Sequence, residues 1–297
     1  MNARALAAAL FTIVVWASLA LLADRMKLVP PLLSAGFALM VGGLVGAWQR
    51  GAWRAPLGTY VLGVGGLFGY HALVFAAFGL APAVEVNLLQ YLWPLLIVLL
   101  TPVFLPGHRL GVHHILGAVL GCGGAALILG GGQVSLSKQY ALGYLCAIVA
   151  AFVWASYSLG CRRLAAFPTS AIAACCLLAG AGSVLLHLAL FGPAAVQALT
   201  GANVLLIIVM GLGPMGVAFL TWDIALKHGD PRAVGALAYL TPLLSTVLLT
   251  QVNGHSFSSQ TGFAAAAIVL GAILGNLRLS LRSFTKLPHI NKVGKRL

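Results

Sequence analysis

The sequence predicts an all-α integral membrane protein in which ten transmembrane helices form an inverted repeat of five plus five. The first reason is composition: 61% of the 297 residues are hydrophobic and only 7% are charged, whereas soluble domains carry about 25% charged residues. The second reason is a series of ten apolar segments, each close to the roughly 20 residues that cross a hydrocarbon core of about 30 Å. The third is that one apolar stretch occurs twice in the chain.

The apolar segments follow one another with only short connections, so no soluble domain fits between them. Their apolar residues recur with a helical period or run without interruption, instead of alternating as in the strands of an outer-membrane barrel. The first segment lacks the small-residue exit of a cleaved signal peptide, so we expect it to be a retained span. The predicted spans are residues 5–23, 31–48, 58–79, 83–105, 111–131, 140–160, 170–191, 203–226, 232–251 and 260–281.

The net charge of +13 is explained by membrane topology and does not call for a nucleic-acid partner. With the N-terminus inside, three of the 17 Lys and Arg residues fall on the outer side and fourteen on the inner side. Cytoplasmic loops carry the excess of Lys and Arg, so we expect both termini in the cytoplasm. The outer residues are Arg25, Lys27 and Lys138; the inner ones are Arg4, Arg50, Arg54, Arg109, Arg162, Arg163, Lys227, Arg232, Arg278, Arg282, Lys286, Lys292, Lys295 and Arg296.

The duplicated stretch defines two halves. Residues 86–100 read VNLLQYLWPLLIVLL and residues 234–248 read VGALAYLTPLLSTVL, and a Val-Trp-Ala-Ser string at residues 15–18 recurs at residues 153–156. Both pairs lie five spans apart, and an odd number of spans per repeat gives the halves opposite orientations. We therefore expect five-helix repeats at residues 1–132 and 133–282, with a Gly-rich boundary near residues 130–133 and a basic tail at residues 283–297.

Each copy of the duplicated stretch carries a proline deep in an apolar segment, Pro94 in the first and Pro242 in the second. Proline lacks a backbone N–H and clashes with the carbonyl four residues earlier, so it kinks or breaks a helix. A duplicated, proline-interrupted span points to the midplane site of a transporter. We expect Pro94 and Pro242 to be the bending points of two gates.

Two titratable residues are candidates for a proton-linked role. His71 shares one face of the third span with Phe75 and Phe78, and such a face suits a substrate carboxylate or a proton relay. A lone histidine in a membrane span is also a common packing residue. Glu85 begins the fourth span, where a charge is costly and suggests function, but where a carboxylate also suits the helix dipole.

A polar stripe follows on the fourth span. Asn87, Gln90 and Tyr91 share one side of this Leu-rich helix, and polar groups in lipid need protein partners, so the stripe faces the bundle interior. Trp93 lies about 200° from Tyr91 on an ideal helix. Both face inward only if Pro94 distorts the helix, and geometry alone favours Tyr91.

Aromatic residues inside two further spans extend this set. Trp154 and Tyr157 share one face of the sixth span with Ser158, and the eighth span presents Met215, Phe219 and Trp222. Trp93 and Trp154 lie too deep for the interfacial aromatic belt. They predict a central cavity for a substrate that is mostly apolar or flat, with a small polar end.

The remaining features favour structural roles. Asp223 is placed to pair with Lys227 four residues later, and the clustered glycines suit close helix packing. The five cysteines lack metal-ligand spacing, and no H-E-x-x-H motif or Ser-His-acid arrangement is present. We expect no metal, no cofactor and no enzymatic activity.

The duplicated motifs resemble the EamA-type repeats of the drug/metabolite transporter superfamily. The resemblance spans residues 5–281 and rests on Trp-Ala-Ser in the first helix of each half and Leu-x-Tyr-Leu-x-Pro-Leu-Leu in the fourth. Glu85-Val86 followed by Tyr91-Leu92-Trp93-Pro94, together with Tyr70-His71, is similar to the YddG branch of amino-acid exporters. The second half departs from this pattern, because it has Ala233 and Thr241 where the first has Glu85 and Trp93.

This resemblance implies a ten-helix basket that exports aromatic and other neutral amino acids across a bacterial inner membrane by alternating access. It also implies that Tyr70, His71, Tyr91, Trp93 and Trp154 line the cavity; the helix faces add Gln90 and Tyr157 as substrate-binding candidates. The partners are then a small-molecule amino acid and the lipid bilayer. The aromatic cavity alone leaves multidrug or metabolite efflux open. The inverted repeat and the missing catalytic constellation disfavour a membrane enzyme or receptor.

Overall fold

The computed structural model describes residues 1–26, 28–130, 136–164, 166–253 and 259–277, and this part of the chain contains helices and no strand. Most of the predicted repeat boundary and the whole basic tail lie outside the described residues. The α-helices are α1 (Ala3–Ala17), α2 (Leu19–Arg25), α3 (Pro31–Ala47), α4 (Leu57–Leu80), α5 (Ala83–Gln90), α6 (Trp93–Phe104), α7 (Val112–Gly130), α8 (Ala141–Arg163), α9 (Ser170–Phe191), α10 (Ala194–Gln197), α11 (Gly201–Leu212), α12 (Ala218–His228), α13 (Pro231–Ala238), α14 (Leu240–Asn253) and α15 (Ser259–Asn276). Short 3₁₀ turns occupy η1 (Arg50–Trp53) and η2 (Lys138–Tyr140), and a π-helical segment, η3 (Gly213–Val217), joins α11 to α12.

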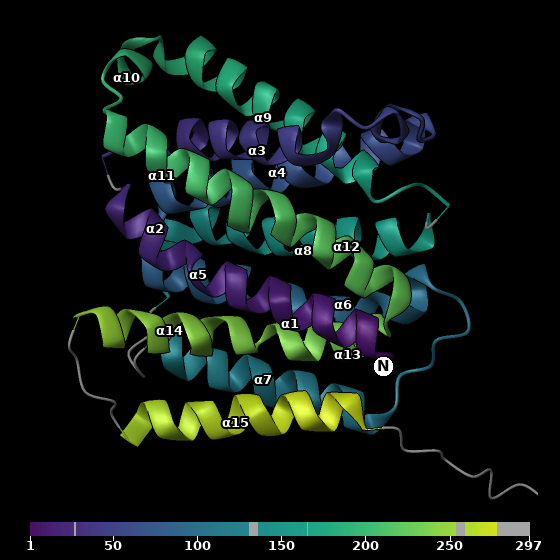
Figure 1. Ribbon diagram of the computed structural model, residues 1–297. Coiled ribbons are helices and arrows are strands. Elements are labelled where there is room, and N and C mark those ends of the chain that lie inside the picture. Colours follow the sequence, from purple (N-terminus) through teal and green to yellow (C-terminus); the bar gives the residue numbers. More distant parts are fainter. Residues whose placement is uncertain (27, 131–135, 165, 254–258, 278–297) are drawn as a thin grey trace, which may run out of the picture.

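The long helices run side by side along one common direction (Figure 1). At one side of the bundle, α3 packs against α9 and α11, while α4 packs against α8 and α9. At the other side, α7 packs against α15. Between these layers α1 lies against α12, and α6 lies against α8 and α13, so helices from both halves of the sequence meet in the middle.

Glycines allow several of these helices to touch closely, as the sequence predicts. A Cβ atom at Gly117 of α7 would lie 2.6 Å from the backbone nitrogen of Gly275 in α15. A Cβ atom at Gly66 of α4 would lie 2.6 Å from Cβ of Tyr157 in α8. Side chains at these positions would force the helices apart, so the glycines serve helix packing.

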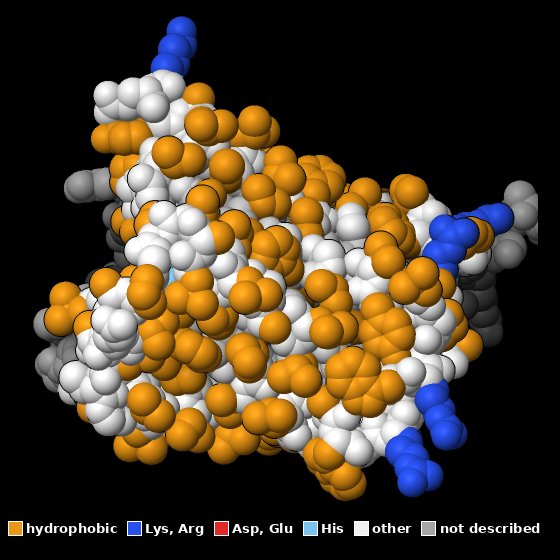
Figure 2. All heavy atoms as spheres, turned by 90° about the horizontal axis from the view of Figure 1, so that it is seen from above, with side chains coloured by type: hydrophobic (Ala, Val, Ile, Leu, Met, Phe, Trp, Pro, Cys, Tyr) orange, Lys and Arg blue, Asp and Glu red, His pale blue; other side chains and the backbone are white. Residues whose placement is uncertain are grey.

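The helices fit a membrane protein. Within the described ranges, seven helical stretches are long and apolar enough to cross a bilayer, and two shorter apolar helices, Ala3–Ala17 and Pro31–Ala47, accompany them. Figure 2 shows hydrophobic side chains over the middle of one face, with Lys and Arg side chains toward its ends. The chain is therefore a multi-pass membrane protein, whereas the count of ten crossings stays a prediction.

Four of the predicted spans are interrupted. The fourth is divided into α5 and α6, and the ninth into α13 and α14. Both α5 and α13 end four residues before a proline, at Gln90 and Ala238 respectively. In a helix, the ring of a proline clashes with the carbonyl of the residue four positions earlier. For Pro94 and Pro242 these residues are Gln90 and Ala238, so the two prolines explain both breaks. The predicted bends are present; the role of the prolines as gates stays a prediction.

The other two interruptions were not predicted. The first span breaks at Ser18, whose Oγ donates to the carbonyl of Val15 over 2.7 Å and whose N–H bonds the same carbonyl. These tight bonds end α1 before α2 begins. The eighth span passes through η3, where Pro214 lacks an N–H. The predicted spans at residues 5–23 and 203–226 are both helical, and each contains an interruption that was not predicted.

Candidate functional site

A cavity of about 700 Å³ lies in the middle of the bundle. Its walls come from helices of both halves, including α1, α4, α5, α8, α12 and α14. This volume falls within the range of roughly 300–1,000 Å³ that is usual for small-molecule sites. Six residues expected in the binding site line it: Tyr70, His71, Gln90, Tyr91, Trp93 and Trp154.

An aromatic cluster forms the inner wall of the cavity, with Trp16 at its centre. The Trp16 ring lies 5.8 Å from that of Trp154, 6.1 Å from Trp93 and 6.0 Å from Phe219, measured between centroids. Most of these contacts are edge-to-face, the geometry that aromatic pairs favour. Trp16 was not among the predicted site residues, although it is the repeat equivalent of Trp154 and could have been found by that signal.

The helix distortions hold this cluster in place. The indole N–H of Trp16 donates to the carbonyl of Pro214 in η3 over 3.0 Å. The π-helical turn therefore presents a carbonyl to a side chain of the other half of the sequence. On the fourth span, the turn at Tyr91 and Leu92 between α5 and α6 lets both Tyr91 and Trp93 face the cavity. An ideal helix would have pointed them in different directions.

A chain of polar side chains covers a second wall. The hydroxyl of Tyr70 donates to Oε1 of Gln90 over 2.7 Å, and Nε2 of Gln90 donates to Oδ1 of Asn87 over 3.2 Å. Both N–H groups of the Asn87 amide and the hydroxyl of Tyr91 are without a hydrogen-bond partner among the described residues. They are free to donate to an acceptor in the cavity.

The orientation of His71 fixes which of its nitrogens faces a ligand. Its Nδ1 lies 2.7 Å from the carbonyl oxygen of Leu67. A carbonyl only accepts, so Nδ1 carries the proton, and Nε2 of the neutral ring is left as an acceptor. Phe75 and Phe78 line the same cavity, as the predicted aromatic face of α4 requires.

Other predicted residues do not line the cavity. Tyr157 is buried behind Trp154, with ring centroids 5.4 Å apart. Glu85 is buried in the first turn of α5, away from the cavity, and its Oε2 has no partner among the described residues. Pro94 and Pro242 are also absent from the lining. The cavity does include Thr241, the repeat equivalent of Trp93, so the two halves contribute different chemistry at matching positions.

Toward the end where the chain begins, the cavity is closed. On this side the ring of Trp222 contacts the cluster, with its centroid 5.1 Å from that of Trp16 and 5.6 Å from that of Trp93. Its indole N–H donates to Oγ of Ser158 over 3.1 Å. The buried Asp223 follows, with Oδ2 2.8 Å from Nζ of Lys227. The predicted pair of these two residues is thus confirmed.

This ion pair belongs to a larger network that ties α8 to α12, which we call the inner latch: Arg162, Phe167, Thr169, Asp223 and Lys227. The hydroxyl of Thr169 donates to Oδ2 of Asp223 over 2.6 Å. Nζ of Lys227 donates to the carbonyl of Phe167 over 2.9 Å and lies 3.6 Å from the centroid of its ring. Arg162 donates to the carbonyl of Lys227.

In the opposite direction the cavity extends to the other end of the bundle. Its lining includes Met26, Val29 and Pro31 around the α2–α3 connection, and Phe78 and Ala83 on either side of the α4–α5 turn. A molecule held against the aromatic cluster is therefore reached from one end only.

Known proteins resemble this chain over nearly its whole length. The model of the EamA-like transporter family matches residues 3–130 and 141–277. A protein named aromatic amino acid exporter YddG, from Ancylobacter novellus, is 41% identical over 274 residues, which cover 89% of this chain and 94% of that protein. A protein of the same name from Escherichia coli is 24% identical over 199 residues, covering 65% and 66% of the two chains. A crystal structure with 39% sequence identity superimposes with a TM-score of 0.86, covering 93% of this chain and 97% of the other.

Proposed function

This chain belongs to the EamA-like transporter family, and we propose that it exports aromatic and other neutral amino acids across a bacterial inner membrane. The observation that carries the proposal is the central cavity, which joins an aromatic wall to a small set of polar groups and is closed at one end. The names of the relatives from Ancylobacter novellus and Escherichia coli support aromatic amino acids as substrates. The function is transport and not catalysis.

The cavity offers complementary groups for a zwitterionic amino acid. Nε2 of His71 accepts a hydrogen bond from the ammonium group. A free N–H of Asn87 and the hydroxyl of Tyr91 donate to the carboxylate. The substrate side chain then packs against Trp16, Trp93 and Trp154, where flat rings gain most from edge-to-face contacts.

The transport cycle is alternating access by two inverted five-helix repeats that together cross the membrane ten times. The two ranges that match the family model support this division. Helix breaks at equivalent positions before Pro94 and Pro242 supply matched bending points. The state seen here is closed at the inner latch and accessible from the opposite end.

Both termini face the cytoplasm in this proposal. The end of the bundle that carries the inner latch also carries the chain start, where Nδ2 of Asn2 donates to the carbonyl of His228. Arg162, Lys227 and Arg232 lie at this same end, and an excess of Lys and Arg marks the cytoplasmic side. The cavity accordingly opens toward the periplasm.

Flux of labelled tryptophan, phenylalanine and threonine into proteoliposomes, with and without a pH gradient, tests this function. We expect flux of tryptophan that His71→Ala and Tyr91→Phe reduce at least tenfold. Tyr157→Phe is the matched control, since Tyr157 lies behind the cavity wall. N-acetyltryptophan should compete weakly, because its nitrogen is no longer an ammonium. Absence of amino-acid flux overturns the proposal. A dependence of flux on the pH gradient indicates that His71 or Glu85 carries a proton.

A further inference from the structure

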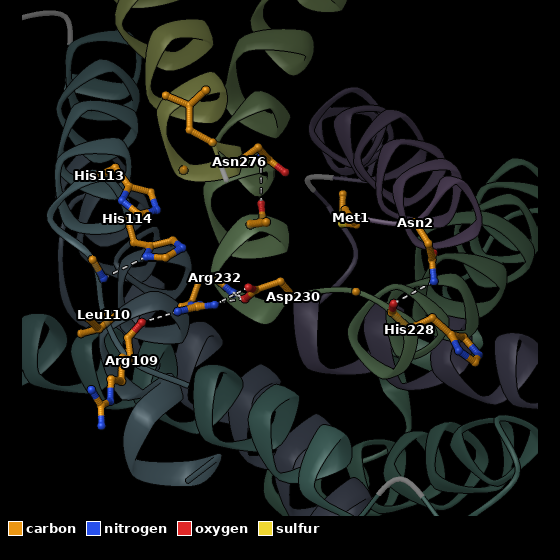
Figure 3. Close-up of a pocket in the computed structure, with 15 residues that line it drawn as sticks. Met1, Asn2, Arg109, Leu110, His113, His114, His228, Asp230, Arg232 and Asn276 are labelled. Atoms are coloured by element: carbon orange, nitrogen blue, oxygen red, sulfur yellow. Dashed lines mark hydrogen bonds and ion pairs between the residues drawn. The ribbon is translucent and has the colours of Figure 1, made fainter. Parts of the chain in front are cut away.

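A second cavity, of about 580 Å³, lies at the end of the molecule where the chain begins, separate from the central cavity. Figure 3 shows its walls: the start of α1, the connection before α7, the turn between α12 and α13, and the end of α15. These elements come from both halves of the sequence. None of its lining residues takes part in the proposed transport site.

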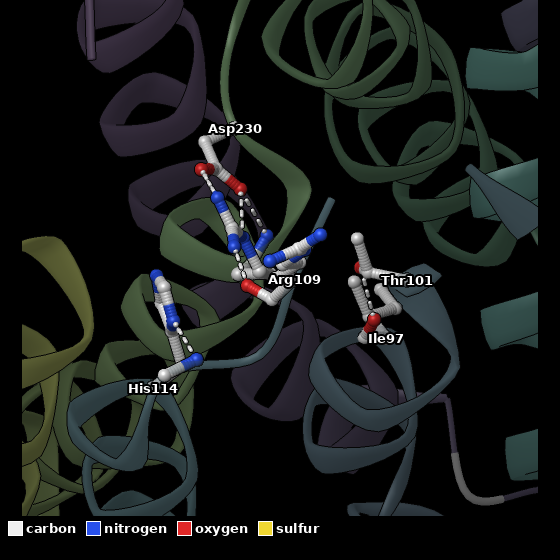
Figure 4. Close-up of polar contacts among 7 residues, drawn as sticks. Ile97, Thr101, Arg109, His114 and Asp230 are labelled. Atoms are coloured by element: carbon white, nitrogen blue, oxygen red, sulfur yellow. Dashed lines mark hydrogen bonds and ion pairs between the residues drawn. The ribbon is translucent and has the colours of Figure 1, made fainter. Parts of the chain in front are cut away.

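The one acidic side chain of this cavity lining, Asp230, is fully engaged. Its Oδ1 accepts the backbone N–H and the Nε–H of Arg232, over 3.0 and 2.9 Å, and its Oδ2 accepts an Nη2–H of the same residue. An Nη1–H of Arg232 donates to the carbonyl of Arg109 (Figure 4). A guanidinium has five N–H donors, so two remain without a partner among the described residues. The charge of Asp230 is therefore balanced by that of Arg232, and Arg232 still has two N–H groups available to a ligand.

A buried histidine adds another donor. His114 is only 9% exposed, and its Nδ1 accepts the backbone N–H of Gly111 over 3.0 Å. The neutral ring must then carry its proton on Nε2. That N–H has no partner among the described residues, and Figure 3 shows the ring directed into the cavity on the same side as Arg232. The ring of His113 lies against it, with centroids 4.0 Å apart. The Nε2–H is therefore available to donate to an acceptor inside the cavity.

We propose that this cavity binds a phosphate-class oxyanion between Arg232 and His114. The planar guanidinium matches phosphate oxygens, and the Nε2–H of His114 supplies a donor from a second helix. In the proposed topology the cavity lies at the cytoplasmic membrane surface. Lipid headgroups and free phosphate both present the required oxygens there. A bound oxyanion bridges α7 to α13 and braces this end of the molecule.

The test uses the purified full chain and two probes. The first is labelled inorganic phosphate, measured by direct binding and by the thermal midpoint at constant ionic strength against chloride. The second is a comparison of thermal midpoints in nanodiscs of phosphatidylglycerol and of phosphatidylcholine. The variants are His114→Phe, which keeps a ring but removes its donor, and Arg232→Lys, which keeps a charge but loses the planar fork. His228→Gln is the control, because Figure 3 shows its ring pointing away from His114 and Arg232.

We expect phosphate or phosphatidylglycerol to raise the midpoint of the native chain and of His228→Gln. Affinity for the effective probe should fall at least tenfold in His114→Phe and in Arg232→Lys. If His114→Phe does not fold, the result for Arg232→Lys alone tests the proposal. Phosphate acting alone identifies a free anion, and phosphatidylglycerol acting alone identifies a headgroup. The proposal is overturned if neither probe acts on the native chain, or if both site variants respond as the native chain does.

Discussion

The phenolic oxygen of Tyr239 lies 3.0 Å from the backbone nitrogen of Leu95 and accepts its hydrogen bond. In an unbroken helix this N–H would bond to the carbonyl of Tyr91, four residues earlier. The break between α5 and α6 removes that partner. Tyr239 is the repeat equivalent of Tyr91, and its hydroxyl satisfies the Leu95 N–H at the break between α5 and α6 in the first half. Tyr91 itself faces the cavity.

Tyr239→Phe should separate these two roles. Removing the hydroxyl leaves the Leu95 N–H without a hydrogen-bond acceptor, which should cost about 1–3 kcal/mol of stability. The loss should appear as a lower denaturation midpoint of the purified protein. The apparent KM for tryptophan should change little, because Tyr239 is fully buried away from the cavity. Tyr91→Phe should show the reverse pattern. An equal loss of stability in both variants would contradict the assignment.

Restoring helix at the prolines should slow transport. Pro94→Ala and Pro242→Ala each reinstate a backbone N–H four residues after Gln90 and Ala238, where the helices now end. We expect a lower kcat for tryptophan flux with a smaller change in KM, because the cavity lining is untouched. Pro102, inside α6 and away from the breaks, provides the matched control. Unchanged flux in both variants would contradict a role of the two prolines in gating.

Breaking the inner latch should destabilise the protein strongly. Lys227→Met leaves the carboxylate of Asp223 buried without its counter-charge, and losing one partner of a buried pair costs about 3–5 kcal/mol. The double variant Lys227→Met with Asp223→Leu should recover much of this loss, since no unpaired charge remains. Denaturation of the two variants side by side measures the difference. A surface lysine, Lys138→Met, should be near neutral.

Truncating Trp16 should weaken transport although the residue is far along the sequence from the duplicated stretch. Trp16→Phe keeps ring contacts with Trp93 and Trp154 but loses the hydrogen bond to Pro214. Trp16→Ala removes both. We expect tryptophan flux to fall slightly in Trp16→Phe and at least tenfold in Trp16→Ala. Equal effects would mean that the hydrogen bond, and not the ring packing, is the important contact.

Low pH should abolish the contribution of Asp230 to the stability of the folded protein. Burial alone raises the pKa of this carboxyl, but the hydrogen bonds and charge of Arg232 outweigh burial and bring the pKa below its ordinary value. The unfolded chain then takes up the proton more readily. The stabilisation is therefore present above the unfolded pKa of about 3.9 and is lost as pH falls through the folded pKa. Thermal midpoints of the native chain and of Asp230→Asn should differ at neutral pH and converge in acid.

Composition and repetition predicted the membrane class, the helical structure and two of the four places where helices break. The prolines acted through local backbone chemistry, so their effect on α5 and α13 was readable from the sequence. The break at Ser18 was not, because it depends on how a serine hydroxyl bonds its own turn. The π-helical turn at Pro214 was likewise missed, since the indole of Trp16 that bonds its carbonyl comes from about 200 residues away in the chain.

The candidate site was predicted for one face of α4 and for the α5–α6 region. Phe75, Phe78 and Asn87 confirm that helical spacing placed these side chains correctly. Tyr157 shows the limit of such reasoning, because a residue on the right face of α8 still lies one layer behind the cavity. Trp16 and Thr241 were missed as site residues, although the repeat relates them to Trp154 and Trp93. The repeat alone does not show which positions of a pair line the cavity, because that depends on packing between the two halves.

The three walls of the central cavity differ in chemistry: the acceptor nitrogen of His71, the donors of Asn87 and Tyr91, and the indole cluster around Trp16. Three different attachment points that do not lie on one line distinguish a molecule from its mirror image. An α-carbon bearing an ammonium, a carboxylate and an aromatic ring satisfies all three in one hand only. If the substrate is held by these three groups as proposed, D-tryptophan and L-tryptophan should not be carried equally.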